Sequence, residues 1–406
     1  MSSLALHSFE LHQKAVDLFI PHCFYWDIEK KVWKYESNFR KLRPYYVLNF
    51  GIIGFMGFQF ALFLIGVSLI DPELFKLKQV LMVILMFVGG NIVLLEDILM
   101  YFYGKELLSV ANWCSSINES EFVGENAMKE FSLKNAIAEE IGKLRKGERF
   151  DFYGIFMNYV VVTYIFLGTV TPLLAVYEDW DPFHLFLLAV DSPKILGGFH
   201  LHLASNPFLK GIRFLSTSIL MQSAFMSTRG FTLIILSFAQ TIIKVFSHLI
   251  EQRVSHIHIR RYREFLLCFR LTDEPLRLLF GGFLLLGFII LVLSVSITFF
   301  GWKFLPWNVY IFLPLLTLIV ASFIILPFKV SCFLYETSQS ILKRWKCQAR
   351  IIIFGVRLYK TLQSLRPLYL PVGNVGKMDD VKRMTYFESL MYYIMNFLIA
   401  FRDKLQ

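Results

Sequence analysis

The chain has 406 residues, of which 56% are hydrophobic, 17% aromatic and only 18% charged, and its formal net charge is +10. A soluble domain carries nearer a quarter of charged residues and interrupts its apolar runs with polar faces, so this composition excludes an ordinary soluble domain. Several apolar runs are long enough to cross the ~30 Å hydrocarbon layer of a bilayer. The sequence therefore predicts an all-α protein with several membrane-spanning helices.

Seven segments are predicted to span the membrane. In chain order they are 45–70, 80–103, 152–176, 214–250, 278–300, 309–333 and 384–401. The fourth contains Arg229 and outlasts one bilayer thickness, which favours a single long, tilted helix that projects past the membrane. The seventh is the shortest and carries polar side chains.

The distribution of Lys and Arg predicts the orientation of these spans. With the amino terminus in the cytosol, 32 of the 41 basic residues fall in cytosolic segments and 8 in outer segments. Cytosolic loops of membrane proteins collect Lys and Arg, so we expect a cytosolic amino terminus and, after seven spans, an extracellular carboxyl terminus. The same asymmetry accounts for the net charge, and no nucleic-acid partner is expected. None of the five cysteines lies in an outer segment, so no disulfide is expected between outer loops.

The chain is expected to divide into four parts. Residues 1–44 form a cytosolic segment, and residues 45–333 hold the first six spans with their loops. Within that part the long outer loop 177–213 is rich in aromatic residues and is expected to fold over the helices as a lid. Residues 334–383 are predicted to form an amphipathic helix and a linker, and residues 384–406 the last span and a short outer tail. The amphipathic helix either extends the spans into a cytosolic anchor bundle or lies on the anionic inner leaflet.

No sequence motif indicates an enzyme. The chain has no Walker A loop, no H-E-x-x-H, no G-x-S-x-G and no Gly-rich dinucleotide fingerprint. His200 and His202 have the spacing of a metal pair, but they lack a cysteine or carboxylate at ligand spacing, so a plain loop is favoured. We therefore expect no catalytic residue, no metal and no cofactor.

Polar side chains within the predicted spans are informative, because each is costly in hydrocarbon and tends to face protein or water. Glu96 and Asp97, near the cytosolic end of the second span, are interpreted as marking the inner interface. Arg229 and Lys329 lie low in the fourth and sixth spans and are interpreted as snorkelling towards that interface.

The seventh span carries a polar stripe. Glu388, Tyr392 and Asn396 are four residues apart, which aligns them on one face of a helix. The opposite side consists of Leu390, Met391, Ile394, Leu398 and Ile399. If copies of this helix surround a symmetry axis, the stripe lines a path for cations. Alternatively, the stripe hydrogen-bonds to a neighbouring helix of the same subunit, and the sequence leaves both hypotheses open.

Together these features resemble the insect chemoreceptor superfamily, the gustatory and odorant receptors of arthropods. The length, the seven spans, the cytosolic amino terminus and the amphipathic helix before a short last span are all similar. The gustatory branch has a signature in its last span of Thr-Tyr, five hydrophobic residues and Gln-Phe. Here Thr-Tyr at 385–386 matches the start, Glu388 and Ser389 depart from the hydrophobic stretch, and Tyr-Tyr at 392–393 replaces Gln-Phe.

The resemblance implies a ligand-gated, non-selective cation channel of the plasma membrane, built as a homotetramer or as a heterotetramer with a related subunit. Its ligand would be a small-molecule tastant or odorant, bound in the outer half of each helical bundle. The pore-lining residues it implies are Glu388, Tyr392, Tyr393 and Asn396. The candidate ligand-binding residues at outer-half depths are Phe87, Tyr164, Phe166, Met221, Phe225 and Tyr310.

Two other classes of function are compatible with seven spans. A receptor coupled to G proteins is opposed by the charge distribution, by the absence of a D-R-Y-like triplet and an N-P-x-x-Y motif, and by the lack of an outer-loop cysteine. A small-solute transporter is opposed by the absence of internal repeats with paired broken helices.

Overall fold

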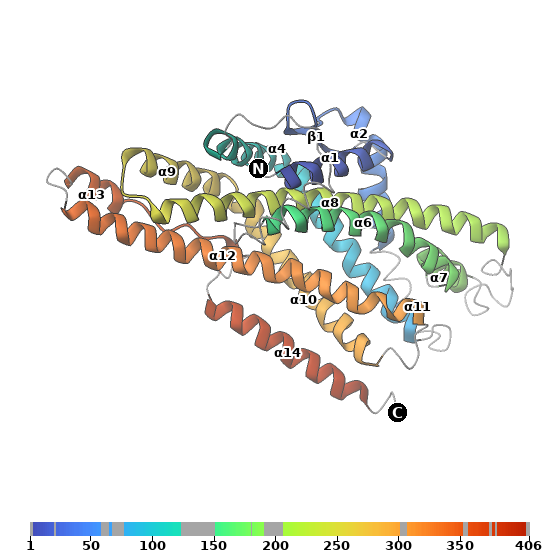
Figure 1. Ribbon diagram of the computed structural model, residues 1–406. Coiled ribbons are helices and arrows are strands. Elements are labelled where there is room, and N and C mark those ends of the chain that lie inside the picture. The colour runs from blue at the N-terminus through green and yellow to red at the C-terminus, as the bar shows by residue number, and fades with distance from the viewer. Residues whose placement is uncertain are drawn as a thin grey trace, which may run out of the picture.

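A computed structural model gives the fold of this chain and is mainly helical (Figure 1). It describes residues 3–19, 22–57, 65–66, 77–122, 151–179, 181–190, 206–300, 307–351, 356–372, 376–377 and 380–402. Five of the described helices are long and apolar enough to cross a membrane. The protein is therefore a mainly α-helical, multi-pass membrane protein.

These five helices hold the second to sixth predicted spans. They are α4 (Leu77–Phe122), α6 (Phe152–Tyr177), α8 (Pro207–Glu251), α10 (Asp273–Phe300) and α12 (Phe312–Ile351). The first predicted span is described in part: it contains the π-helix η1 (Val47–Met56), and its residues 58–64 and 67–70 lie outside the described residues. The seventh coincides with α14 (Asp380–Arg402), which is not among the five apolar helices. Seven crossings and the orientation of the termini stay predictions.

Helix α8 confirms the prediction of one long fourth helix. Its 45 residues correspond to about 67 Å, roughly twice the thickness of the hydrocarbon layer. Helix α12 has 40 residues and is about 60 Å long for the same reason. Figure 1 shows the two running along each other, with the short helices α9 (His256–Leu271) and α13 (Val356–Gln363) at one end of the bundle. At the other end lie α7 (Pro182–Val190) and α11 (Trp307–Tyr310).

The long fourth helix does not continue into residues 252–277. Helix α8 ends at Glu251, because Gln252 adopts an extended backbone conformation, and the chain then turns back. Ser255 caps the new helix α9, its side chain accepting a hydrogen bond from the backbone N–H of His258 at 3.2 Å. The turn is held by α12, whose Trp345 Nε1 donates to the carbonyl of Gln252 at 3.4 Å.

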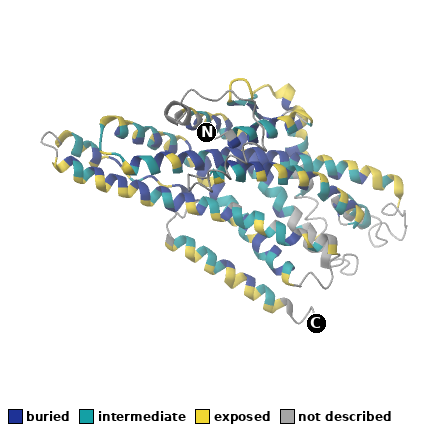
Figure 2. Ribbon diagram, viewed as in Figure 1, coloured by how far each residue is buried: buried dark blue, intermediate teal, exposed yellow. Residues whose placement is uncertain are grey.

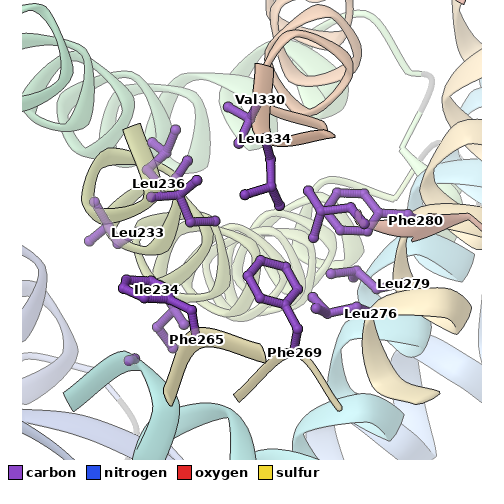
Figure 3. Packing of buried hydrophobic residues seen from close by; sticks show 14 of the residues in the cluster. Leu233, Ile234, Leu236, Phe265, Phe269, Leu276, Leu279, Phe280, Val330 and Leu334 are labelled. Atoms are coloured by element: carbon purple, nitrogen blue, oxygen red, sulfur yellow. The ribbon is translucent and has the colours of Figure 1, made fainter. Parts of the chain in front are cut away.

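The main apolar core of the described residues joins the membrane helices to α9. Figure 3 shows its centre, where side chains from α8, α9, α10 and α12 point toward one another. The labelled residues are Leu233, Ile234, Leu236, Phe265, Phe269, Leu276, Leu279, Phe280, Val330 and Leu334. Because all of them are buried, α9 packs as part of the bundle rather than as a loose connector.

The amino-terminal segment is a folded unit that the sequence did not predict. It comprises α1 (Ser3–Asp17), an antiparallel hairpin of β1 (Phe24–Asp27) and β2 (Val32–Tyr35), and α2 (Phe39–Tyr46). Phe9, Trp26 and Trp33 form its aromatic centre, with ring centroids 4.7 to 5.3 Å apart. Figure 2 shows buried residues concentrated where this segment covers the middle of α8.

Polar contacts fix this segment on three membrane helices. On α6, Asn158 Nδ2 donates to the carbonyl of Leu4 at 2.7 Å. On α4, the amide of Asn112 exchanges two hydrogen bonds with the backbone of Trp33, both at 2.7 Å. On α8, Arg229 Nε donates to His12 Nδ1 at 2.9 Å. The segment therefore docks in one defined position.

Gly230 of α8 is required for this docking. A Cβ atom at Gly230 would lie 2.5 Å from the ring of Phe24 and 2.9 Å from that of His12. We expect Gly230→Ala to destabilise the docked segment by about 1–3 kcal/mol, because both rings must move. Limited proteolysis of the amino-terminal segment and thermal unfolding measure this effect.

Gly211→Ala, in the same helix, is the matched control. Nothing lies within 4 Å of a Cβ atom at Gly211. Alanine there should leave the segment protected and stabilise the helix by up to about 1 kcal/mol. Equal protease sensitivity of the two variants would contradict the docking described above.

Two buried histidines make the docked segment sensitive to acid. Burial, and to a smaller degree the positive charge of Arg229, lower the pKa of His22 to about 3 and that of His12 well below its usual value. A histidine with a depressed pKa in the folded state stabilises the fold above its unfolded pKa near 6.5, and this contribution is lost as pH falls from about 6.5 towards 3. At pH 5, His22 alone should cost about 2 kcal/mol. The protease sensitivity of the amino-terminal segment should therefore rise from pH 7 to pH 5. The variant His22→Gln should show a weaker dependence on pH. A wild-type protein whose protease sensitivity does not change with pH would contradict this prediction.

Candidate functional site

Helix α14 is attached to the bundle along one edge. It lies apart from the other helices in Figure 1, beside α10. Tyr386 makes the main attachment: its hydroxyl donates to the carbonyl of Leu284 at 3.0 Å, and its ring lies 5.1 Å from that of Phe328 on α12 and 5.6 Å from that of Phe288 on α10. Phe387 adds a second ring contact with Phe328 at 5.8 Å.

The polar stripe of α14 faces away from the bundle. Glu388, Tyr392 and Asn396 are all exposed, and Tyr392 keeps 64% of its surface accessible. In the part of the chain that the structure describes, no hydrogen bond joins these three side chains to another helix. The second sequence hypothesis, a polar seam within one subunit, therefore has no support here.

The other faces of α14 are only partly covered. Tyr393 is 55% exposed, although its ring lies 5.6 Å from Phe288. Leu390 and Ile394 are buried against the bundle, as expected for the apolar side. Met391 and Ile399, assigned to that same side, are exposed. A helix with this much uncovered surface presents both a polar and an apolar face to whatever surrounds it.

A small pocket lies between α6 and α12. It has a volume of about 50 Å³ and is lined by Phe156, Tyr159, Val160, Thr163, Tyr164, Leu318, Ile319 and Ser322. Sites that hold organic ligands usually enclose roughly 300–1,000 Å³. The pocket in this conformation is therefore too small for a whole tastant or odorant. Two of its polar lining residues, Thr163 and Ser322, were not among the candidates predicted from the sequence.

Two of the six candidate ligand-binding residues meet in the structure. Tyr164 lines the pocket, and its ring centroid lies 5.7 Å from that of Phe225 on α8. Phe166 points away, with 55% of its surface exposed.

The other three candidates lie elsewhere. Tyr310 donates its hydroxyl to the carbonyl of Thr298 at 3.0 Å. Phe87 and Met221 are half-buried on α4 and α8 and do not line the pocket. The six candidates were predicted from their depth in the membrane. Depth along a span does not specify which face of its helix a side chain occupies.

An ion-pair cluster joins the two ends of the outer segment 177–213. Arg213, at the start of α8, contacts Asp181 at 2.5 Å and Asp179 at 2.9 Å, and both Arg213 and Asp181 are buried. His184 of α7 lies 3.7 Å from Asp179, and burial together with the charge of Arg213 lowers the pKa of His184. His200 and His202 lie outside the described residues. Among the described residues, no group of three or more His, Cys, Asp or Glu could hold a metal ion.

One interpretation of a polar residue inside the spans is wrong. Arg229 does not snorkel, since it is 3% exposed and donates to His12 of the amino-terminal segment. Glu96 and Asp97 are both enclosed by protein, and their assignment to the inner interface stays a prediction. Lys329 is exposed, in agreement with the prediction for that residue.

The comparisons with known proteins add no relative. No model of a known protein family matches the chain, and no curated protein matches it significantly. The resemblance described from the sequence therefore stays a prediction.

Proposed function

We propose that the protein is a chemosensory receptor that acts as a ligand-gated, non-selective cation channel, with α14 as the pore-lining helix. The observation that carries this proposal is the exposed polar face of α14, where Glu388, Tyr392 and Asn396 lie in line and none of the described helices covers them. The resemblance of the sequence to the gustatory and odorant receptors supplies the class of receptor.

The physical argument concerns what must cover this face. The 23 residues of α14 span about 34 Å, enough to cross the hydrocarbon layer. A carboxylate, a phenol and an amide on one face of such a helix are costly against lipid, so they face water or other protein. Several copies of α14 around one axis satisfy both demands, because they enclose a water-filled path lined by carboxylates that attract cations. The resemblance favours four copies.

The apolar and aromatic attachment of α14 suits a gate. Tyr386, Phe387 and Tyr393 pack on α10 and α12 by ring contacts, while most of the helix remains uncovered. Ligand binding between α6, α8 and α12, near Tyr164 and Phe225, would act through α12 on this contact. Because the pocket is small in this conformation, the ligand must favour a second conformation in which the pocket is larger.

Neutralisation of Glu388 tests the pore assignment. We expect Glu388→Gln to assemble normally and to change unitary conductance or cation permeability several-fold, because it removes one negative charge per subunit from the path. Single-channel recording and reversal potentials in asymmetric salt measure this effect.

Glu264→Gln is the matched control, since Glu264 is a partly exposed helical carboxylate of α9, away from α14. It should leave conductance and selectivity unchanged. If Glu388→Gln keeps the conductance and selectivity of the wild type, Glu388 does not line the pore. Substrate uptake without a ligand-evoked current would favour a transporter instead.

A further inference from the structure

The pocket between α6 and α12 is open on the lateral surface of the bundle. Two of its lining residues lie on that surface, since Tyr159 of α6 is 50% exposed and Leu318 of α12 is 66% exposed. Two others, Val160 and Tyr164, are buried. The pocket is therefore a groove with a mouth between the two helices rather than a closed cavity.

The mouth of this groove lies in a part of the surface that faces lipid. Exposed apolar side chains continue beyond it, with Val162 and Phe166 on α6 and Ile325 on α12. From Lys329 to Arg344, in contrast, every exposed residue of α12 is polar or charged. A change from apolar to charged surface along a helix marks the edge of the hydrocarbon layer, so this edge lies near Lys329.

The groove lies deep in the hydrocarbon layer. Leu318 precedes Lys329 by 11 residues, which is about 16 Å along α12. Thr163 is the twelfth of the 26 residues of α6 and so lies near the middle of that helix. Since half of the hydrocarbon layer is ~15 Å thick, both walls place the groove close to the middle of the bilayer.

One polar group of the groove has no partner. The hydroxyl of Thr163 forms no hydrogen bond with any residue that the structure describes. A threonine of a membrane helix commonly donates to the carbonyl four residues earlier, as Thr169 does to Ile165 at 3.0 Å. On the facing wall Ser322 donates in this way to Leu318 at 2.7 Å, and its oxygen keeps a lone pair that can accept. An unsatisfied hydroxyl is costly in hydrocarbon, and acyl chains offer it no partner.

The volume of the groove limits what occupies it. About 50 Å³ is a small fraction of the roughly 300–1,000 Å³ of sites that enclose a whole organic ligand. A closed cavity of this size would exclude such a molecule. An open groove admits one end of it, while the remainder stays among the acyl chains. The larger pocket of the second conformation would take up more of the same molecule.

Two common classes of molecule do not match the groove. The polar groups of a phospholipid stay in the headgroup layer, ~15 Å from the middle of the bilayer, so only its apolar chain would reach the groove. That chain would leave the hydroxyl of Thr163 unsatisfied. A sugar or another polyol would bring many hydroxyls into hydrocarbon, where few polar side chains line the groove to meet them.

We infer that the groove binds a lipophilic small molecule with one hydroxyl or carbonyl oxygen, which reaches it from the bilayer. The oxygen accepts a hydrogen bond from Thr163, and a hydroxyl in addition donates to Ser322. The apolar part of the molecule packs on Phe156, Tyr159 and Leu318. Binding at the groove does not require a channel, and only the role of the bound molecule as the opening ligand rests on the proposed function.

Photolabelling of the purified full-length protein in lipid nanodiscs tests this binding. The probe is decan-1-ol with a diazirine in its chain, and labelled peptides are mapped by mass spectrometry. We expect saturable labelling of residues 156–164 or 318–322, which unlabelled decan-1-ol displaces. Labelling that does not saturate, or that is spread evenly over the lipid-facing helices, would overturn the inference.

Two further probes distinguish the possible occupants. Decane with the same diazirine lacks the oxygen and should label the groove several-fold more weakly than the alcohol. Phosphatidylcholine with a diazirine in the middle of one chain should label the groove no more than other lipid-facing surface. Saturable labelling of the groove by the phosphatidylcholine probe would show that a lipid chain occupies it and would contradict the inference.

Variants assign the binding to the hydroxyl and to the mouth. Thr163→Val keeps the shape of the side chain, and it should raise the half-saturating concentration of the alcohol several-fold. Leu318→Trp fills the mouth and should abolish saturable labelling. Thr317→Val is the matched control, because Thr317 already donates to Leu313 at 2.8 Å and does not line the groove. Equal labelling of Thr163→Val and Thr317→Val would remove the Thr163 hydroxyl from the site.

Labelling and ionic current are independent measurements. If the groove is labelled as expected and the protein passes no ligand-gated current, the binding site stands and the proposed function fails. If a ligand evokes current and the groove is not labelled, the proposed function stands and the inference about the groove fails.

Discussion

The close packing of α8 against its neighbours holds the described structure together. Inside hydrocarbon every backbone polar group must be satisfied within the chain, so the crossings are helices, and their arrangement depends on which side chains meet. Over residues 227–230, α8 faces four partners in turn: Asp97 and Glu96 of α4, His12 of α1 and Phe24 of β1. The amino-terminal segment, the acidic pair and the central core therefore share one short stretch of helix.

Helix α14 stands outside this network, and the proposed function depends on that separation. The bundle of α4, α6, α8, α10 and α12 buries polar side chains such as Asp97 and Arg229 at its centre, whereas α14 leaves Glu388, Tyr392 and Asn396 exposed. In the proposed channel the helical bundle holds the ligand. Helix α14, which few contacts hold to the bundle, can then move between two positions at modest cost. A channel needs this division between a rigid binding region and a mobile pore helix.

Hydropathy predicted the apolar helices well because it reports composition over a whole turn or more. The third span was placed to within one residue of α6, and its start is explained by Asp151, whose side chain accepts from the N–H of Gly154 at 3.1 Å. The single long fourth helix was also correct. What failed were contacts between residues far apart in the chain: Arg229 was assigned to the interface because its partner, His12, lies 217 residues away. Two features have local signals in the sequence. Ser255 is a typical cap after the turn at Gln252, and aromatic residues flank the hairpin turn at Lys31, which has a positive φ of 51°.

The central claim is that copies of α14 surround a common axis with their polar faces inward. Electron microscopy of the full-length protein in lipid nanodiscs tests this claim most directly, because particle images reveal how many copies assemble and which helix lies at the centre. The account predicts four copies around one axis, with Glu388, Tyr392 and Asn396 facing a central path. A monomer, or an assembly in which α14 lies at the periphery against lipid, would contradict it.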